Sequence, residues 1–137
     1  MLGQLRTYDF KQVAVIVGGI QIQGFVDGEA ITIEPDADEW TETVGNDGEV
    51  TRSKSNNSMS RIMLKLAQSA ESNQYLSGLR LSGGIVPVMV KDNSGLSIHA
   101  GEQAYVKSRP AAAFARESGE REWVIVVPNM VSVEGGN

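Results

Sequence analysis

Large aliphatic side chains stand at every second position of residues 60–66, at Ile62, Leu64 and Leu66, which is the pattern of a β-strand with one buried face. The side chains expected to face the core are Ile62, Leu64 and Leu66, and those on the opposite face are Arg61, Met63 and Lys65. Residues 30–34 repeat the pattern with Ile31 and Ile33 facing the core, and Pro35 either ends that strand or places it at a sheet edge. This periodicity predicts β-sheet structure.

Two glycine pairs separate the apolar segments. Gly18-Gly19 lies between the buried run 13–17 and the short run 20–22, and consecutive glycines supply the positive φ angles of a tight hairpin turn. Gly83-Gly84 precedes a second group of strands, which starts at residues 85–90. Neither pair fits a phosphate-binding loop or a dinucleotide fingerprint, so both are interpreted as turns.

A long polar hairpin is predicted in the first half of the chain. Residues 41–44 and 49–55 alternate Thr, Val and charged residues around the Gly-Asn-Asp-Gly cluster of residues 45–48, whose members tolerate the left-handed backbone of turns. A further turn at residues 56–58 leads into the strand that starts at Ser60. We expect these strands to form one antiparallel sheet with one wet or interface-facing side.

One convincing helix is predicted, from Ala70 to about Arg80. Ser69 is the candidate N-cap, and Glu71 in the first turn suits the helix dipole. A narrow apolar face is formed by Tyr75, Leu76 and Leu79.

The second group of strands begins with residues 85–90, where Pro87 indicates an edge position or a bulge. It continues through residues 96–99, 103–107 and 123–127, with a turn at residues 92–95. Residues 110–115 (Pro-Ala-Ala-Ala-Phe-Ala) fit either a short helix or an irregular crossing.

The expected fold is therefore mainly β: two packed antiparallel sheets, a β-sandwich or partly closed barrel, with one flanking α-helix. A length of 137 residues suits a single domain over residues 1–137 and leaves no room for a second. The final Gly-Gly-Asn is expected to be a frayed tail.

Composition limits the chemistry that the chain can perform. The sequence holds no cysteine and a single histidine, His99, so disulfides, thiolate nucleophiles and multi-histidine metal sites are excluded. A net charge of -5 opposes tight binding to nucleic-acid phosphates. The N-terminus has no signal-peptide pattern and no apolar run approaches the length of a membrane span, so we expect a protein assembled in the cytoplasm with no membrane partner.

Seven of the 17 acids fall between residues 34 and 50, and they are Glu34, Asp36, Asp38, Glu39, Glu42, Asp47 and Glu49. Their spacing does not fit a calcium loop, because the required glycine and closing Glu are missing. Nothing in the spacing brings two of them together as catalytic acids, and no serine lies in a nucleophile elbow. We therefore expect no catalytic residues, no cofactor and no metal.

The acidic run is followed by a stretch, residues 51–66, that has Arg and Lys but no acid. An arm that is negative in one part and positive in the next is self-complementary in a head-to-tail contact between subunits. A solvated β-arm explains the pattern equally well. Trp40 lies among the acids, where an aromatic side chain is either tucked back onto the domain or buried by a partner.

Several segments, in this order, resemble the small-subunit tail tube proteins of contractile-tailed bacteriophages, and together they cover most of the chain. They are residues 28–34 (GEAITIE), 43–50 (TVGNDGEV), 69–76, 92–95 (DNSG), 104–107 (AYVK), Pro110 and 121–125 (REWVI). The chain departs from the family at Ser69-Ala70-Glu71, where a Thr-Ser-Pro opening is common, and at Pro87 within a strand.

The resemblance implies a β-sandwich or partly closed barrel whose copies form hexameric rings. The rings stack into a hollow tube through which the genome DNA passes without specific binding, inside a contractile sheath. The implied partners are further copies of the chain, the sheath protein, the baseplate and the tape measure protein, and the implied location is the tail of the virion.

We predict that residues 40–59 form a ring-stacking arm and that the helix at residues 69–80 lies near a subunit boundary. The residues expected at self-assembly contacts are Trp40, Asn46, Asp47, Gly48, Arg52, Lys54, Asn56, Asn57, Met59, Arg61, Tyr75 and Leu76.

Alternative interpretations stay open on the sequence. The chain fits another tube component, such as a terminator, a baseplate-proximal subunit, or the tube of a tailocin or type VI secretion system. From other classes, it fits a monomeric carbohydrate-binding β-sandwich that uses Trp40 and the carboxylates, or a small acid-dependent hydrolase that uses two of Asp36, Asp38, Glu39 and Glu42.

Overall fold

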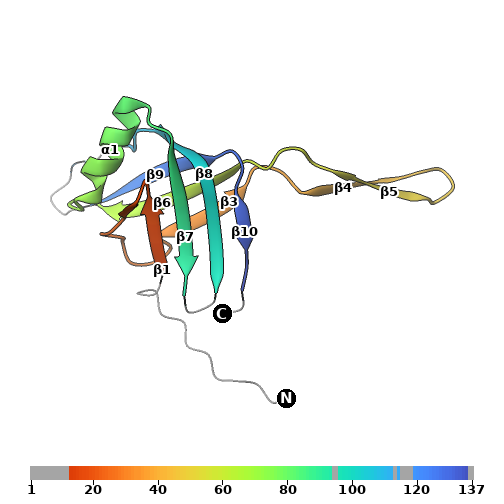
Figure 1. The fold of residues 1–137 in the computed structure, drawn as a ribbon, viewed down its shortest axis with the longest axis horizontal. Helices are drawn as coiled ribbons and strands as arrows, with labels where there is room; N and C mark the ends of the chain where they lie inside the picture. Colours follow the sequence, from red (N-terminus) through yellow and green to blue (C-terminus); the bar gives the residue numbers. More distant parts are fainter. Residues whose placement is uncertain (1–12, 94–95, 113, 115–118, 136–137) are drawn as a thin grey trace, which may run out of the picture.

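A computed structural model describes residues 13–93, 96–112, 114 and 119–135 (Figure 1). The described elements are β1 (Val13–Val17), β2 (Ile20–Gln21), β3 (Ile31–Pro35), β4 (Trp40–Val44), β5 (Val50–Lys54), β6 (Ser60–Ala67), α1 (Ser72–Ser82), β7 (Val86–Asp92), β8 (Ser97–Ser108), β9 (Glu120–Val127) and β10 (Val131–Val133). All strand pairs are antiparallel, which confirms the mainly β class with one helix.

Two sheets share the long strand β8. Sheet A consists of β2, β1, β7, the first part of β8 and β10, and sheet B consists of the last part of β8 with β9, β6 and β3. Along β8, His99 is paired with Val90 of β7, whereas Tyr105 is paired with Val126 of β9. Among the described strands the order is open, with β2 and β3 at opposite ends, so the sheets pack as a sandwich and do not close into a barrel.

The core lies between the inner faces of the two sheets. Ile62, Leu64 and Leu66 of β6 are fully buried, as their alternation predicts, and Ile31 and Ile33 pack against the same cluster. Sheet A contributes a second set of buried side chains, which are Val15, Val17, Val88 and Val90. Alternating burial along strands of both sheets is the arrangement by which a sandwich removes its apolar surface from water.

Helix α1 packs against β8 and covers one end of the sandwich (Figure 1). Leu76 is completely buried in the core, and the Tyr75 hydroxyl donates a hydrogen bond of 2.8 Å to the Val17 carbonyl. Gly83 ends the helix in the left-handed conformation, with a φ of 67°. The predicted apolar face and the glycine stop are thus confirmed.

The predicted start of the helix is wrong. The N-cap is Glu71 and not Ser69, no side chain caps the first turn, and that turn holds no acid. The Asn73 side chain instead donates hydrogen bonds to the carbonyls of Ala67 and Gln68, which keeps the chain in a turn before the helix begins. In this local turn Ser69 lies two residues before the N-cap, outside the helix.

Several predicted strands differ in the structure. Pro87 lies between β1 and β8 in the interior of sheet A, at a bulge where the register shifts between Val86 and Val88, which confirms the bulge and rejects the edge. Residues 96–99 and 103–107 were expected as separate strands but form one strand, β8. Within β8, Gly101 lets the strand pass close to Val127, because a Cβ at that position would collide with Cγ1 of Val127.

The expectation that the polar hairpin joins the strand from Ser60 in one sheet is also wrong. Strands β4 and β5 pair only with each other among the described strands, whereas β6 is paired with β3 on one side and β9 on the other. Because both edges of β6 are occupied, the hairpin cannot pair with β6. The hairpin turn itself is confirmed.

Some predictions fall partly outside the described residues. These are the turn at residues 92–95, the choice of conformation for residues 110–115, and the C-terminal Gly-Gly-Asn. Strand β10 was not predicted. The one helix of the described residues is 11 residues long, and no helix there is long and apolar enough to cross a membrane.

We expect Leu76→Ala to lower the free energy of unfolding by about 2–5 kcal/mol, because it leaves a cavity under α1. Leu81→Ala is the matched control, since Leu81 lies on the same helix with 73% of its side chain exposed and should change the free energy by less than about 0.5 kcal/mol. Urea denaturation of both variants measures the difference. Equal effects would contradict the placement of α1.

Candidate functional site

The most unusual feature of the structure is a β-hairpin arm that lies outside the folded body. Strands β4 and β5 point away from the sandwich, as Figure 1 shows, and all ten of their residues are exposed. The predicted arm at residues 40–59 corresponds to this hairpin and to the segment that returns from Lys54 to Met59.

The two faces of the arm differ in chemistry. Directly paired residues of an antiparallel ribbon lie on the same face, so the pairs Trp40 with Lys54, Glu42 with Arg52, and Val44 with Val50 define one side, which we call the Trp40 face. The opposite side, the hydroxyl face, consists of Thr41, Thr43, Thr51 and Ser53. Only the Trp40 face therefore offers apolar area to a partner.

The tip of the arm holds the predicted residues Asn46, Asp47 and Gly48. The Asp47 carboxylate accepts a hydrogen bond of 3.1 Å from the Glu49 N–H, and Gly48 has a φ of 84°, which favours glycine. The Gly45 N–H also donates to the Glu49 carbonyl at 2.7 Å, so the turn closes through its own backbone. The tip is acidic, because Asp47 and Glu49 have no cation beside them in sequence.

Trp40 lies near the root of the arm with Arg52 stacked on it. The Arg52 guanidinium carbon is 4.0 Å from the centroid of the Trp40 ring, a cation–π distance. The indole keeps 39% of its surface exposed, and Val44 and Val50 near the tip keep 67% and 61%. The guanidinium covers one face of the ring, so that face is not free to stack on a sugar.

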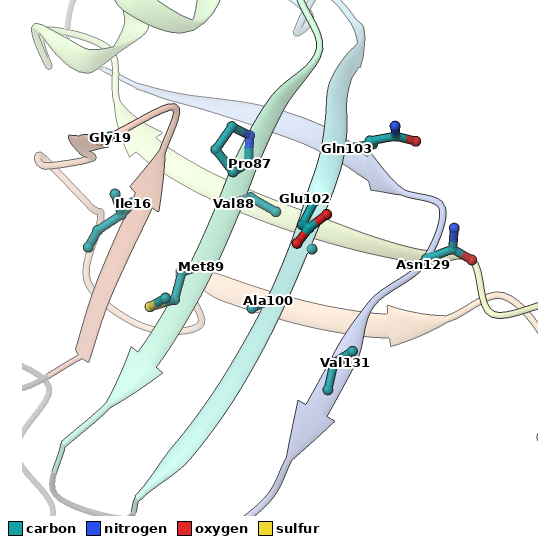
Figure 2. Close-up of a pocket in the computed structure, with 11 residues that line it drawn as sticks. Ile16, Gly19, Pro87, Val88, Met89, Ala100, Glu102, Gln103, Asn129 and Val131 are labelled. Carbon is teal, nitrogen blue, oxygen red and sulfur yellow. The ribbon is translucent and has the colours of Figure 1, made fainter.

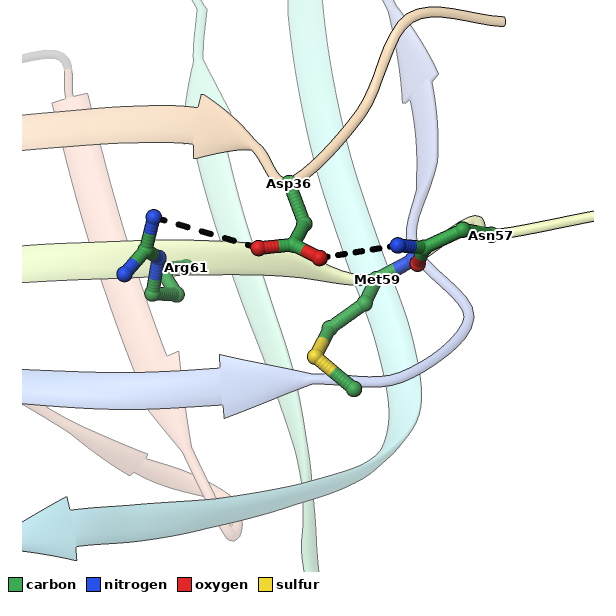
Figure 3. A network of polar contacts seen from close by, with 4 residues as sticks. All are labelled: Asp36, Asn57, Met59 and Arg61. Carbon is green, nitrogen blue, oxygen red and sulfur yellow. Dashed lines mark hydrogen bonds and ion pairs between the residues drawn. The ribbon is translucent and has the colours of Figure 1, made fainter. Parts of the chain in front are cut away.

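The root of the arm is fixed to the body through Asp36, as Figure 3 shows. The Asn57 amide donates a 2.8 Å hydrogen bond to one oxygen of Asp36, and Arg61 lies 3.9 Å from the other. The Asp36 N–H donates to the Met59 carbonyl, while the Asn57 side-chain oxygen accepts from the Met59 N–H at 3.0 Å. The structure thus brings Asn57, Met59 and Arg61 together at the root.

A second set of contacts ties the root to the connection between β9 and β10. The Ser58 hydroxyl donates to the Asn129 side-chain oxygen at 2.8 Å, and the Met130 N–H donates to the Ser58 carbonyl. Sequence reasoning identified neither Asp36 as an anchor nor Asn129. Their partners are distant in sequence, and polar residues near a turn give no local signal of such contacts.

The sequence order predicts an acidic part of the arm followed by a basic part, but the structure does not separate the charges in that way. Glu42 is paired with Arg52 across the ribbon, so acids of one strand lie beside cations of the other. Along the arm, the cations Arg52 and Lys54 are nearer the root, and the acids Asp47 and Glu49 are at the tip. The charge difference therefore runs from root to tip.

The remaining predicted contact residues lie elsewhere. Asn56 is exposed in the returning segment, whereas Leu76 is fully buried and Tyr75 is half-buried with its hydroxyl bonded to β1. Leu76 therefore serves the core of the monomer and is not available to a partner.

The described residues contain no group of three or more His, Asp or Glu side chains that could hold a metal ion. Within the acidic run, Asp36 is engaged with Asn57 and Arg61. His99 lies 2.8 Å from the Ser132 hydroxyl, its cross-strand partner on β10.

Removing one anchor of the root should loosen the arm without unfolding the body. Asn57→Ala loses the bonds to Asp36 and Met59, which together contribute about 1 kcal/mol because they are exposed to solvent. Hydrogen exchange should accelerate at the Met59 amide, while β6 keeps its protection. Asn56→Ala, the exposed neighbour, is the control and should leave that amide unchanged; identical exchange in both variants would reject the anchor.

No family model matches the chain. Structural protein ORF10 of Pseudomonas phage KPP10 is 33% identical over 150 residues, covering 100% of this chain and 87% of the relative.

Three solved structures share the fold. The tube-terminating cap of the anti-feeding prophage has a TM-score of 0.62 at 12% identity, covering 98% of this chain and 96% of the cap. A sheath/tube terminator and a sheath-tube complex, both of the PVC extracellular contractile injection system in the extended state, have TM-scores of 0.61 and 0.59, each at 12% identity. The terminator match covers 96% of this chain and 99% of that chain, and the sheath-tube match covers 93% and 92%.

The fold, the arm and the relative agree with the resemblance seen in the sequence, and none of them indicates an enzyme. The chain belongs to the family of the phage structural protein ORF10, and it shares its fold with tube and terminator components of contractile injection systems.

Proposed function

We propose that this protein is the tail tube subunit of a contractile-tailed phage, and that its hexameric rings stack into a hollow tube. The observation that carries the proposal is the anchored arm, which projects from a sandwich whose fold is shared with tube and terminator components of contractile injection systems. A small domain does not need a fully exposed hairpin for its own stability. Such a hairpin is typical of an element that reaches another subunit.

The expected surroundings of the tube follow from the same assignment. The sheath lies outside, the baseplate starts assembly, and a tape measure protein sets the length. Genome DNA passes through the lumen without specific binding, which the net charge of -5 supports because like charges repel the phosphate backbone.

The arm at residues 40–59 is proposed as the ring-stacking element. Its root is fixed by Asp36 and Ser58, whereas the ribbon beyond Trp40 is held only by its own strand pairing among the described contacts. A fixed root sets the direction of the arm, and a free ribbon can bind a neighbour.

Helix α1 is proposed to lie near a subunit boundary. Leu81 and Ile85, at the C-terminal end of the helix and just beyond it, are 73% and 67% exposed. Two large apolar side chains at this end of the molecule are suited to burial by an adjacent copy.

A tube terminator is the second candidate, because two of the three structures described above are a terminating cap and a terminator. A terminator has the same fold but closes one end of the tube. It therefore forms a single ring and does not polymerise.

Negative-stain electron microscopy with light scattering distinguishes the candidates. Purified protein is examined over a concentration and salt series, alone and with isolated baseplates as nucleators. Hollow tubes of stacked six-fold rings are expected. Discrete rings that never stack would assign the terminator role, and monomers under every condition, including with baseplates, would contradict both.

Shortening the arm should abolish stacking and leave the monomer folded. Thr41 and Ser53 are directly paired and, like Gly45 with Glu49 and Glu39 with Ser55, fall on the hydrogen-bonded pairs of the ribbon. An Asn-Gly turn between them can therefore replace residues 42–52 and close a short hairpin. Because the removed residues are exposed and outside the core, the melting temperature should stay close to that of the full chain. Tubes of unchanged length and number, counted by electron microscopy, would reject the arm as the stacking element.

A further inference from the structure

The two outer faces of the sandwich differ in chemistry. A row of neighbouring side chains crosses β1, β7, β8 and β10 on sheet A and consists of Ile16, Met89, Ala100 and Val131. The row lines a shallow groove of about 730 Å³, shown in Figure 2. On the outer face of sheet B, Lys65 lies 3.9 Å from Glu122. An aliphatic groove accepts any apolar surface, and a face of ion pairs is satisfied by water, so neither face identifies a particular partner.

A smaller recess beside α1 is more selective. It has a volume of about 310 Å³, and three arginines line it, so we call it the arginine pocket. Arg80 comes from the last turn of α1, Arg109 directly follows β8, and Arg121 belongs to β9. The other lining residues that the structure describes are uncharged, and they are Gln68, Asn73, Gln74, Ser77, Pro110 and Trp123. Cations gathered without an acid repel one another and favour a bound anion.

The fold does not supply that anion from the described residues, whose ion pairs all lie elsewhere. The Nε of Arg80 is buried and has no hydrogen-bond partner there. The Arg121 guanidinium donates a 3.2 Å hydrogen bond to the Glu120 carbonyl and lies 5.7 Å from the centroid of the Phe114 ring, and neither contact neutralises its charge. The pocket therefore gains from an anion that another molecule provides.

The amide side chains beside the arginines have their oxygens in use. The Asn73 side-chain oxygen accepts a 2.9 Å hydrogen bond from the Trp123 indole, and the Gln68 side-chain oxygen accepts one of 3.0 Å from the Gly119 N–H. The arginines themselves only donate hydrogen bonds. A ligand that only accepts them fits best, and a carboxylate is such a group because it matches the fork of a guanidinium.

The tip of the arm presents carboxylates in an accessible form. Residues 44–51 contain Asp47 and Glu49 and no base, and neither acid forms an ion pair with a described residue. Gly45 and Gly48 lie on either side of the Asn46-Asp47 pair and carry no side chain that could cover it. A pocket of this size is too small for a helix, which is about 10 Å across, but it admits acidic side chains at the end of a projecting turn.

The arm tip and α1 lie at opposite ends of the molecule, as Figure 1 shows. Asp36 and Ser58 fix the root of the arm, so the tip cannot turn back to the pocket of its own chain. A carboxylate from the tip must therefore enter the pocket of a second copy. Such a contact between two different patches is heterologous, and heterologous contacts repeat along an assembly.

We propose that the acidic tip of the arm docks into the arginine pocket of a neighbouring copy, where Arg80, Arg109 and Arg121 neutralise Asp47 and Glu49. The contact is made by the end of the ribbon, so it does not depend on the two faces of the arm. The same contact makes α1 part of a subunit boundary. The inference rests on the proposed function of the arm in self-assembly and names the surface that receives its tip.

Neutralising either surface should weaken assembly. Asp47→Asn with Glu49→Gln removes both charges of the tip and keeps the side-chain oxygen that closes the turn. Arg109→Gln with Arg121→Gln removes two charges from the pocket. Each double variant should raise the protein concentration needed for tube assembly at least several-fold, measured by light scattering and electron microscopy. Combining all four substitutions should be no worse than the weaker of the two double variants, because both act on one contact.

Two control variants change the net charge by the same amounts at exposed positions outside the contact. Asp38→Asn with Glu39→Gln matches the tip variant, and Lys91→Gln with Lys107→Gln matches the pocket variant. Both controls should assemble at close to the wild-type concentration. If the double arginine variant has a lowered melting temperature, Arg109→Gln alone replaces it, because Arg109 is exposed. Additive losses in the combined variant, or equal losses in the controls, would overturn the contact.

Cysteine cross-linking provides an independent measurement, because the chain contains no cysteine of its own. The variant Asn46→Cys with Gln74→Cys has one exposed cysteine at the tip and one at the pocket, and both acids and all three arginines are kept. It is assembled under reducing conditions, then oxidised and examined by non-reducing gel electrophoresis. A ladder of covalent multimers is expected from assembled tubes and only monomer from dissociated protein. The control, Asn46→Cys with Glu102→Cys, has its second cysteine at an exposed position of β8 outside the pocket and should give at least several-fold less ladder.

The outcomes separate the docking site from the proposed function. If wild-type protein forms no tubes, with or without baseplates, the proposed function fails. If the cysteine variants form normal tubes but the Gln74 pair gives no ladder, or the Glu102 pair links equally well, the tip binds elsewhere and the arginine pocket is rejected as its docking site. If neutralising the pocket weakens assembly but neutralising the tip does not, the pocket binds a different anion and the proposal is likewise rejected.

Discussion

The continuity of β8 is the constraint on which the body depends. One strand of 12 residues is paired with β7 and β10 through its first part and with β9 through its last part, so it belongs to both sheets. Gly101 lies where the sheets approach, and the absence of its side chain leaves space for Val127. A larger residue would separate the sheets and open the core. Helix α1 then closes one end through Leu76 and through Asn73, which accepts a 2.9 Å hydrogen bond from the Trp123 indole.

Because the sandwich is complete without it, the arm is free for another role. A two-stranded ribbon without a core is marginally stable by itself. Its position is set at the root, where Asp36 joins Asn57 and Arg61 and where Ser58 contacts Asn129. The exposed Val44 and Val50 bury little apolar surface in the monomer, and their exposure is consistent with a surface that is buried on assembly.

The two outer faces divide the surface of the body into a charged side and an apolar side. The ion pair between Lys65 and Glu122 suits contact with water, whereas the row from Ile16 to Val131 suits contact with protein. One side of the body therefore gains from burial against protein, and the other is satisfied by water. The fold is shared with a tube-terminating cap and a sheath/tube terminator.

Local patterns in the sequence determined the strand at residues 60–66, the hairpin turn at residues 45–48 and the glycine end of the helix, because periodicity and turn chemistry act over a few residues. They also indicated the arm and the resemblance to tail tube proteins. Only the tertiary structure decided that β8 spans both sheets, that β4 and β5 leave the sandwich, that Leu76 is core, and that Asp36 anchors the arm. Those outcomes depend on partners far apart in the chain, whose pairing local propensity does not encode.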